Sequence, residues 1–139
     1  MNRSWMLAGC ALLGLSGAAS ADAAQCTNAT LLGAYGYQEE GQAIGAGFAQ
    51  FRSVGELTFD GAGKGSRVTT IWYSDFEVVP ETPSAITYSV SSDCRFTFTY
   101  SNGETFSGVI TGGGMRLLYI ETGGDPSRSG HAERLRSDQ

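Results

Sequence analysis

The chain has 139 residues, 41% of them hydrophobic, and its 9 Lys and Arg against 14 Asp and Glu give a formal net charge of −5 at pH 7. Proteins that bind nucleic acid carry clustered basic side chains, and helices that bind anionic membranes carry a basic face. This acidic sequence has neither feature. Composition therefore excludes both functions and predicts one small globular domain.

The first 23 residues have the three-part layout of a secretory signal peptide. A short positive start precedes an almost unbroken apolar run from Trp5 to Gly17, and small residues follow, so cleavage is expected after Ala21 or Ala23. The apolar run is shorter than the roughly 20 residues that span a bilayer. We therefore expect a periplasmic or secreted protein without a membrane span, with a single domain at residues 24–139.

The three cysteines predict one disulfide. Residues 7–10, Leu-Ala-Gly-Cys, have the order of a lipoprotein signal, but the apolar run continues beyond Cys10, which favours peptide cleavage over lipidation of this cysteine. Removal of the peptide leaves Cys26 and Cys94, which have a single intramolecular pairing available in an oxidising compartment. No CxxC spacing occurs and the single histidine, His131, is distant in sequence, so we expect neither a metal site nor a cofactor.

The chain after residue 24 predicts an all-β fold. No helical period persists for three turns, and short runs of β-branched and aromatic residues alternate with glycine-rich turns. Several runs have one apolar and one polar face, as antiparallel strands with one buried face do. Eight strands are expected, at Leu31–Glu39, Gly47–Phe59, Ser66–Phe76, Ser84–Ser91, Arg95–Tyr100, Glu104–Thr111, Met115–Thr122 and Gly130–Arg136.

Short turns connect these runs. Ser-Asn-Gly at residues 101–103 is typical of a tight hairpin, three glycines at residues 112–114 supply positive φ angles, and Pro80 and Pro83 interrupt the chain. Eight short strands joined in order can remove their edges by closing into an antiparallel up-and-down barrel, which is the predicted fold; a β-sandwich is the alternative. Such a barrel is either filled by its own side chains or holds one small ligand.

The glycine cluster in FDGAGKGSRV, residues 59–68, superficially resembles a phosphate-binding loop. That motif requires another glycine five positions before Gly63 and a hydroxyl residue after Lys64, whereas this chain has Thr58 and Gly65 there. The residues that follow favour a strand instead of the helix that the motif needs. Residues 60–65 are therefore predicted to form a hairpin loop.

Three segments resemble a group of known proteins. They are Cys-x-x-Ala-x-Leu-x-Gly-x-Tyr at residues 26–35, Val-Gly-x-Leu-Thr-Phe-Asp-Gly-x-Gly at residues 54–63 and Thr-Tyr-x-Val-x-x-Asp-Cys at residues 87–94. They are similar to small exported bacterial proteins with a β-barrel outline, which implies an all-β barrel and a Cys26–Cys94 bridge. The outline is also similar, in fold alone, to lipocalin-like and allene-oxide-cyclase-like barrels. The resemblance implies no activity and no catalytic residues.

Aromatic and polar residues that share strand faces are the candidate ligand contacts, because an aromatic-walled cavity with a few polar groups is the usual small-molecule pocket. In this hypothesis the arginine orients an acidic or carbonyl group and the aromatic rings provide apolar contact. The predicted lining residues are Tyr35, Tyr37, Arg52, Trp72 and Tyr119. Tyr and Trp are also common packing residues in strands, so a filled core explains them too. Glu39 and Glu40 together indicate a solvated strand end.

The leading functional hypothesis is a barrel that binds a small, mostly apolar molecule in its interior. The alternative is an isomerase or cyclase that shapes an apolar metabolite, with Arg52, Glu121 and His131 as candidate catalytic residues. The third hypothesis is a structural envelope protein with a filled core and no ligand. All three are compatible with the sequence.

Overall fold

A computed structural model describes residues 25–43, 49–74, 78–80, 83–124 and 128–136. The elements in these ranges are the short 3-10 helix η1 (Asn28–Leu31) and the strands β1 (Gly33–Ala43), β2 (Ala49–Phe59), β3 (Lys64–Tyr73), β4 (Val78–Pro80), β5 (Ser84–Val90), β6 (Arg95–Tyr100), β7 (Thr105–Thr111), β8 (Arg116–Gly123) and β9 (Ser129–Arg134). The predicted signal peptide lies outside the described residues and remains a prediction.

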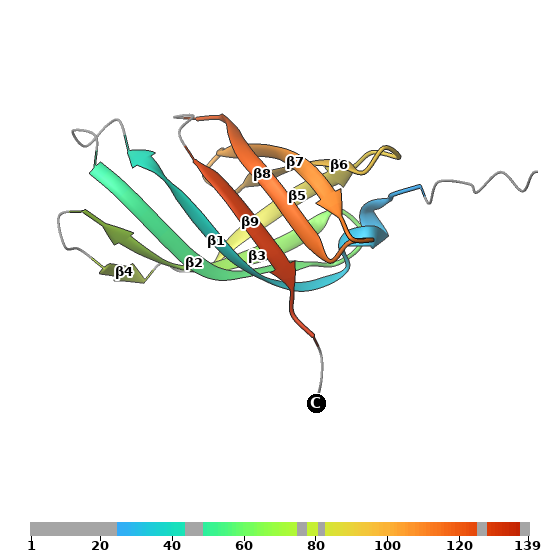
Figure 1. Cartoon of the computed structure of the whole chain (residues 1–139), viewed down its shortest axis with the longest axis horizontal. Coiled ribbons are helices and arrows are strands. Elements are labelled where there is room, and N and C mark those ends of the chain that lie inside the picture. The colour runs from blue at the N-terminus through green and yellow to red at the C-terminus, as the bar shows by residue number, and fades with distance from the viewer. Residues whose placement is uncertain (1–24, 44–48, 75–77, 81–82, 125–127, 137–139) are drawn as a thin grey trace, which may run out of the picture.

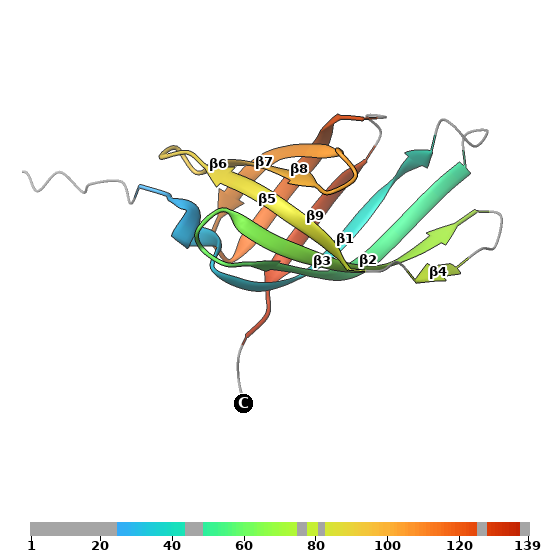
Figure 2. The same cartoon turned by 180° about the vertical axis from the view of Figure 1, so that it is seen from behind.

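Eight of the strands form a closed, all-antiparallel up-and-down barrel (Figure 1). Around the ring the order is β1, β2, β3, β5, β6, β7, β8 and β9, and the pairing of β9 with β1 closes it. The view from behind shows β3 and β5 side by side (Figure 2). The predicted barrel is therefore confirmed over the sandwich, because each of these strands has a neighbour on both sides.

The short strand β4 was not predicted from the sequence. It pairs with Thr70–Trp72 of β3, whereas β5 pairs with Lys64–Arg67 along the same edge of β3. Pro80 and Pro83 have no amide hydrogen to donate, so a continuous strand cannot run along this edge. The edge is therefore shared by two shorter strands.

The two ends of the barrel differ. At the helix end, Leu31 of η1 packs into the core, and a Cys26–Cys94 disulfide joins the segment before η1 to the turn before β6. This disulfide confirms the predicted pairing. At the hairpin end, the β1–β2 pairing continues to Ala43 although β9 reaches only to Glu40, so the hairpin projects beyond its neighbour (Figure 1).

Aromatic side chains fill the middle of the barrel. The Phe98 ring lies 4.8 Å from Phe106, 5.2 Å from Tyr119 and 5.3 Å from Tyr100, measured between ring centroids. The predicted alternation in β6 is confirmed, since Phe96, Phe98 and Tyr100 are all buried. Each such aromatic pair contributes about 0.5–1.5 kcal/mol beyond the area that it buries. These rings form a packed layer between the two ends.

The glycine cluster forms a hairpin loop between β2 and β3, as predicted. Asp60 Oδ1 accepts hydrogen bonds from the amides of Ala62 at 2.7 Å and Lys64 at 2.9 Å. These backbone bonds lower the pKa of Asp60. Within the described ranges, no helix is long and apolar enough to cross a membrane.

Candidate functional site

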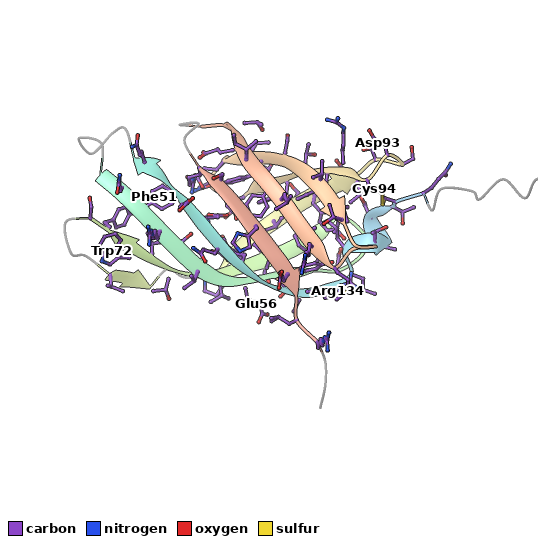
Figure 3. All side chains as sticks on the ribbon, in the orientation of Figure 1. Phe51, Glu56, Trp72, Asp93, Cys94 and Arg134 are labelled. Carbon is purple, nitrogen blue, oxygen red and sulfur yellow. A yellow bond between two sulfur atoms is a disulfide. The ribbon has the colours of Figure 1, made fainter. Side chains whose placement is uncertain are left out.

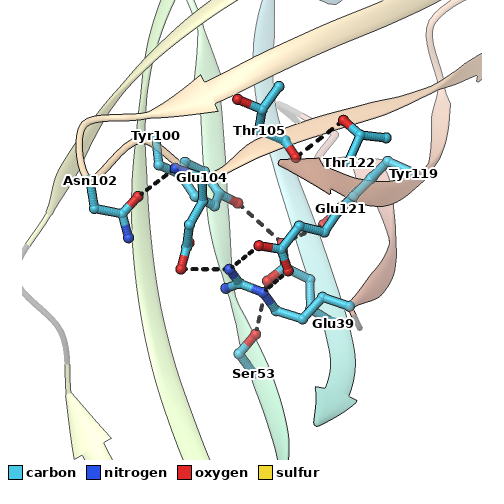
Figure 4. Close-up of polar contacts among 10 residues, drawn as sticks. Glu39, Ser53, Tyr100, Asn102, Glu104, Thr105, Tyr119, Glu121 and Thr122 are labelled. Carbon is cyan, nitrogen blue, oxygen red and sulfur yellow. Dashed lines mark hydrogen bonds and ion pairs between the residues drawn. The ribbon is translucent and has the colours of Figure 1, made fainter. Parts of the chain in front are cut away.

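A buried polar cluster lies inside the hairpin end of the barrel, with the carboxyl group of Glu39 at its centre. Glu39 is only 1% exposed. Its Oε1 accepts hydrogen bonds from the hydroxyls of Tyr100 and Tyr119, each at 3.1 Å, and its Oε2 accepts one from Ser53 Oγ at 3.3 Å (Figure 4). Donors from β2, β6 and β8 thus converge on one carboxyl group of β1.

Strand register and one glycine bring Glu39 and Tyr119 together. Strand β9 separates β1 from β8, and its residue Gly130 pairs with Glu39 on one side and with Tyr119 on the other. A Cβ added to Gly130 would lie 2.6 Å from the Tyr119 ring and 2.7 Å from Glu39 Cγ. The missing side chain of Gly130 therefore leaves the space in which the other two side chains meet.

Burial makes ionisation of Glu39 costly. It raises the pKa of the Glu39 carboxyl, and the positive charges of Arg128 and Arg67 oppose that rise. Burial also raises the pKa of Tyr100 and of Tyr119 well above the ordinary value of 10.0, and the charge of Glu39 adds to the effect. Both phenols are therefore protonated at neutral pH and act as donors to the carboxyl.

Tyr37 brings a second kind of polar group to the cluster. It is 4% exposed, and its hydroxyl has no hydrogen-bond partner among the described residues. Burial raises the pKa of Tyr37 to about 12, and the nearby hydroxyls of Thr69 and Ser53 partly offset that rise. Neither hydroxyl has the geometry of a hydrogen bond to Tyr37 Oη. A buried polar group left unsatisfied costs about 1–3 kcal/mol, so this hydroxyl requires an explanation.

Two arginines supply positive charge. The guanidinium carbon of Arg67 lies 3.9 Å from the centroid of the Tyr100 ring, a cation–π contact. Arg128 donates to the carboxylate of Glu121 through Nε at 2.7 Å and Nη2 at 3.0 Å, and its Nη2 lies 2.6 Å from Glu104. Burial by itself lowers the pKa of Arg128. The bonds to Glu121 and Glu104 together outweigh this effect and raise the pKa above its ordinary value.

Side chains form the layer above the cluster, toward the hairpin end. Phe51 precedes Ser53 by two residues on β2 and faces the same way, one layer farther out. The guanidinium carbon of Arg128 lies 5.6 Å from the Phe51 ring and 5.2 Å from the Phe106 ring. Side chains of β2 and β7, together with Arg128, therefore form this layer.

A pocket of about 560 Å³ lies near the same end and is lined mainly by outward-facing residues. Alternation along β2 and β3 turns Phe51 and Ile71 inward, so Arg52 and Trp72 face outward. These two residues are direct partners in the β2–β3 pairing, and both line the pocket. Trp72 lies at the opposite end of the molecule from Cys94 (Figure 3).

The candidate ligand-binding and catalytic residues predicted from the sequence lie in three different parts of the structure. Tyr37 and Tyr119 lie in the Glu39 cluster, and Glu121 lies beside it in an ion pair with Arg128. Tyr35 lies at the helix end, where its hydroxyl donates to Gly114 O at 2.7 Å. Arg52, Trp72 and His131 are on the outer surface, because each follows or precedes an inward-facing residue.

Sequence reasoning missed the central residue of the cluster. Glu39 is buried and does not lie at a solvated strand end, so that interpretation was wrong. A signal was present, because Glu39 shares the period-two face of Tyr35 and Tyr37. Tyr100, Arg67 and Arg128 were also missed. Within the described ranges, no group of three or more His, Cys, Asp or Glu side chains could hold a metal ion.

No known family model matches the chain, and no curated protein matches it. Among solved structures, it is similar to a de novo designed fluorescence-activating β-barrel, with 16% identity, 75% of this chain and 93% of that chain covered, and a TM-score of 0.44. It is also similar to EF1p2_mFAP2b bound to DFHBI, with 14% identity, 76% and 94% coverage and a TM-score of 0.47. Similarity at this level carries no argument about function.

Proposed function

We propose that this protein binds a small, mostly apolar molecule with one polar group in the hairpin end of the barrel. The observation that carries the proposal is the unpartnered hydroxyl of Tyr37 beside the buried carboxyl of Glu39. A filled structural core does not need these groups, since burying polar groups costs stability unless they are fully paired. Perturbed, buried titratable groups of this kind concentrate at functional sites.

The geometry favours a ligand whose polar group both donates and accepts hydrogen bonds. Tyr37 Oη can donate to such a group or accept from it, and Glu39 Oε2 has capacity beyond the 3.3 Å bond from Ser53. Inward-facing Phe51 and Ile71 supply apolar contact around it. The packed layer of Phe98 and its neighbours restricts the ligand to this end, so the site takes a compact molecule and not a long chain.

The proposal includes export to an oxidising compartment. The Cys26–Cys94 disulfide supports this part, because disulfides persist in the periplasm and outside the cell and are rare in the cytosol. The signal-like layout of residues 1–23 supports it as well.

The test compares two tyrosine variants at opposite ends of the barrel. Tyr37→Phe removes the unpartnered hydroxyl, and the control Tyr88→Phe removes a hydroxyl that donates to Asn28 O at 3.2 Å near the helix end. Thermal unfolding is measured with a panel of compact apolar alcohols, ketones and carboxylic acids. We expect at least one compound to raise the Tm of the wild-type protein and of Tyr88→Phe, but to raise that of Tyr37→Phe much less. Equal shifts in all three proteins contradict the assignment.

A second candidate function is isomerisation or cyclisation of the bound molecule. The raised pKa of Glu39 and the two phenols that donate to it favour this candidate, because such a carboxyl can exchange a proton with a ligand. Incubation of the protein with any compound that raises its Tm, followed by analysis of the recovered compound, distinguishes the two functions. A ligand recovered unchanged indicates binding, and a rearranged isomer, formed by wild type but not by Glu39→Gln, indicates catalysis.

A further inference from the structure

A row of polar residues crosses four strands on the outer surface near the hairpin end. Trp72 of β3 pairs with Arg52 of β2, Arg52 pairs with Glu40 of β1, and Glu40 pairs with Ser129 of β9. All four face outward, and Trp72 is 40% exposed. The row therefore presents a large aromatic ring and three polar side chains on one continuous face of the barrel.

This row lines two adjoining pockets. The first, of about 560 Å³, contains all four residues together with the amide side chains of Gln42 and Gln50. The second, of about 190 Å³, shares Glu40 and Ser129 with the first and adds Gln38 and His131. The two hollows follow one another around the barrel from β3 to β9, so they match an elongated occupant better than a compact one.

The charges of the row balance and leave polar atoms available. Arg52 and Glu40 are cross-strand neighbours of opposite charge, yet no ion pair or hydrogen bond joins their side chains to each other or to another described residue. Opposite charges at neighbouring positions cancel at a distance, which favours a neutral ligand over an anion or a cation. The guanidinium offers planar donors and the carboxylate offers acceptors.

We propose that this outer surface binds a neutral oligosaccharide. A sugar ring presents a face of C–H groups, which packs on an aromatic ring such as that of Trp72, and an edge of hydroxyls that both donate and accept. Arg52, Glu40 and Gln50 supply the planar polar groups that pair with neighbouring hydroxyls. The adjoining second pocket extends the site beyond one sugar unit. Glu39 also borders the second pocket, but Tyr37, Tyr100 and Tyr119 of the interior cluster line neither pocket, so the inference goes beyond the function proposed for that cluster.

The experiment titrates the exported protein with three neutral oligosaccharides, cellohexaose, maltohexaose and chitohexaose, by calorimetry and by tryptophan fluorescence. We expect at least one of them to bind, and we expect Trp72→Ala to weaken its affinity at least about tenfold, as loss of a central aromatic contact does. Trp72→Phe should restore part of the affinity. The control, Val68→Ala, removes an exposed side chain of the same strand outside both pockets and should bind as wild type does.

Two results would overturn the proposal. The first is no binding of any of the three sugars up to millimolar concentration. The second is sugar binding that Trp72→Ala and Arg52→Ala leave unchanged, which would place the sugar elsewhere. Because Trp72 and Arg52 are exposed, their variants are expected to fold, and thermal unfolding verifies this. Tyr37 of the interior site lines neither pocket, so Tyr37→Phe should leave sugar affinity unchanged, and failure of the interior site and failure of this site are distinguishable.

Discussion

Tyr119 donates a hydrogen bond to Glu39 at 3.1 Å although β9 lies between their strands. The bond spans the position of Gly130, which pairs with both residues and has no side chain to keep them apart. A single glycine in β9 therefore determines whether the carboxyl of β1 and the phenol of β8 meet. The buried cluster depends on this arrangement.

Replacing Gly130 by alanine is expected to destabilise the protein by about 1–3 kcal/mol, the usual cost of overpacking a core. The added Cβ would lie 2.6 Å from a packed aromatic ring, which cannot move freely. Urea unfolding measures the change. The control is Gly36→Ala on β1, where the new Cβ meets only the flexible end of Leu135 at 3.2 Å, and we expect a change within about 0.5 kcal/mol. Equal costs at the two positions would contradict the packing described for Gly130.

Glu39→Gln tests the protonation of the cluster. Burial raises the folded-state pKa of Glu39 above the ordinary value of 4.5, so below that pH the carboxyl is protonated in both the folded and the unfolded state. As the pH rises toward the folded-state pKa, the unfolded chain releases the proton first. The stability of the wild type should then fall relative to Glu39→Gln by about 1.4 kcal/mol per pH unit, and level off above the folded-state pKa.

The measurement for Glu39 is the free energy of unfolding of both proteins from about pH 4 to about pH 8, and only the difference between them is interpreted. A wild type that gains stability relative to Glu39→Gln over this range would mean that the cluster favours the ionised carboxylate. That outcome would contradict the raised pKa.

Arg128→Leu should be strongly destabilising. Its removal leaves the carboxylate of Glu121, whose side chain is 1% exposed, without its cation, and breaking a buried ion pair in this way costs about 3–5 kcal/mol. The matched control is Arg116→Leu, which breaks the pair with Glu133 on the surface at a cost of less than about 1 kcal/mol. Chemical denaturation compares the two variants, and a similar loss in both would show that Glu121 does not depend on Arg128.

The disulfide should stabilise the protein chiefly by restricting the unfolded chain. Cys26 and Cys94 are separated by 68 residues, for which the chain-entropy relation gives about 4 kcal/mol. We expect the double variant Cys26→Ala/Cys94→Ala to lose about this amount in urea unfolding, and the addition of reductant to change the wild type but not the variant. A variant as stable as the oxidised wild type would contradict this contribution.

The strands and the closed barrel were predictable because they depend on patterns among residues that are close together in the sequence. Phe96, Phe98 and Tyr100 alternate with polar residues, and the Ser-Asn-Gly turn follows directly, so the direction and the buried face of β6 follow from a few neighbours. The disulfide was equally predictable, because only one pairing is available to Cys26 and Cys94. The strand β4 was missed because it has only three residues and its last residue is Pro80, where the sequence indicates an interruption.

The cluster was harder to predict because its partners are remote. Tyr100 and Tyr119 lie 61 and 80 residues from Glu39, and no local pattern links them. A glutamate is rarely buried, so its place beside Glu40 suggested solvent. The outward orientation of Arg52 and Trp72 depends on which face of β2 and β3 turns into the barrel, and polar and aromatic residues occur on both faces of these strands.

The most direct test of the central claim is the mass of the exported protein under native conditions and again after denaturation. The denatured mass reports whether the chain is cleaved after Ala21 or Ala23, as the sequence predicts, and whether two hydrogens are lost in the disulfide. We predict a native mass larger by that of one small molecule, with the excess retained in Tyr88→Phe and reduced in Tyr37→Phe. A native mass equal to the denatured mass, together with no stabilisation by any compound of the panel, would contradict ligand binding and favour a structural barrel whose interior is filled by its own side chains.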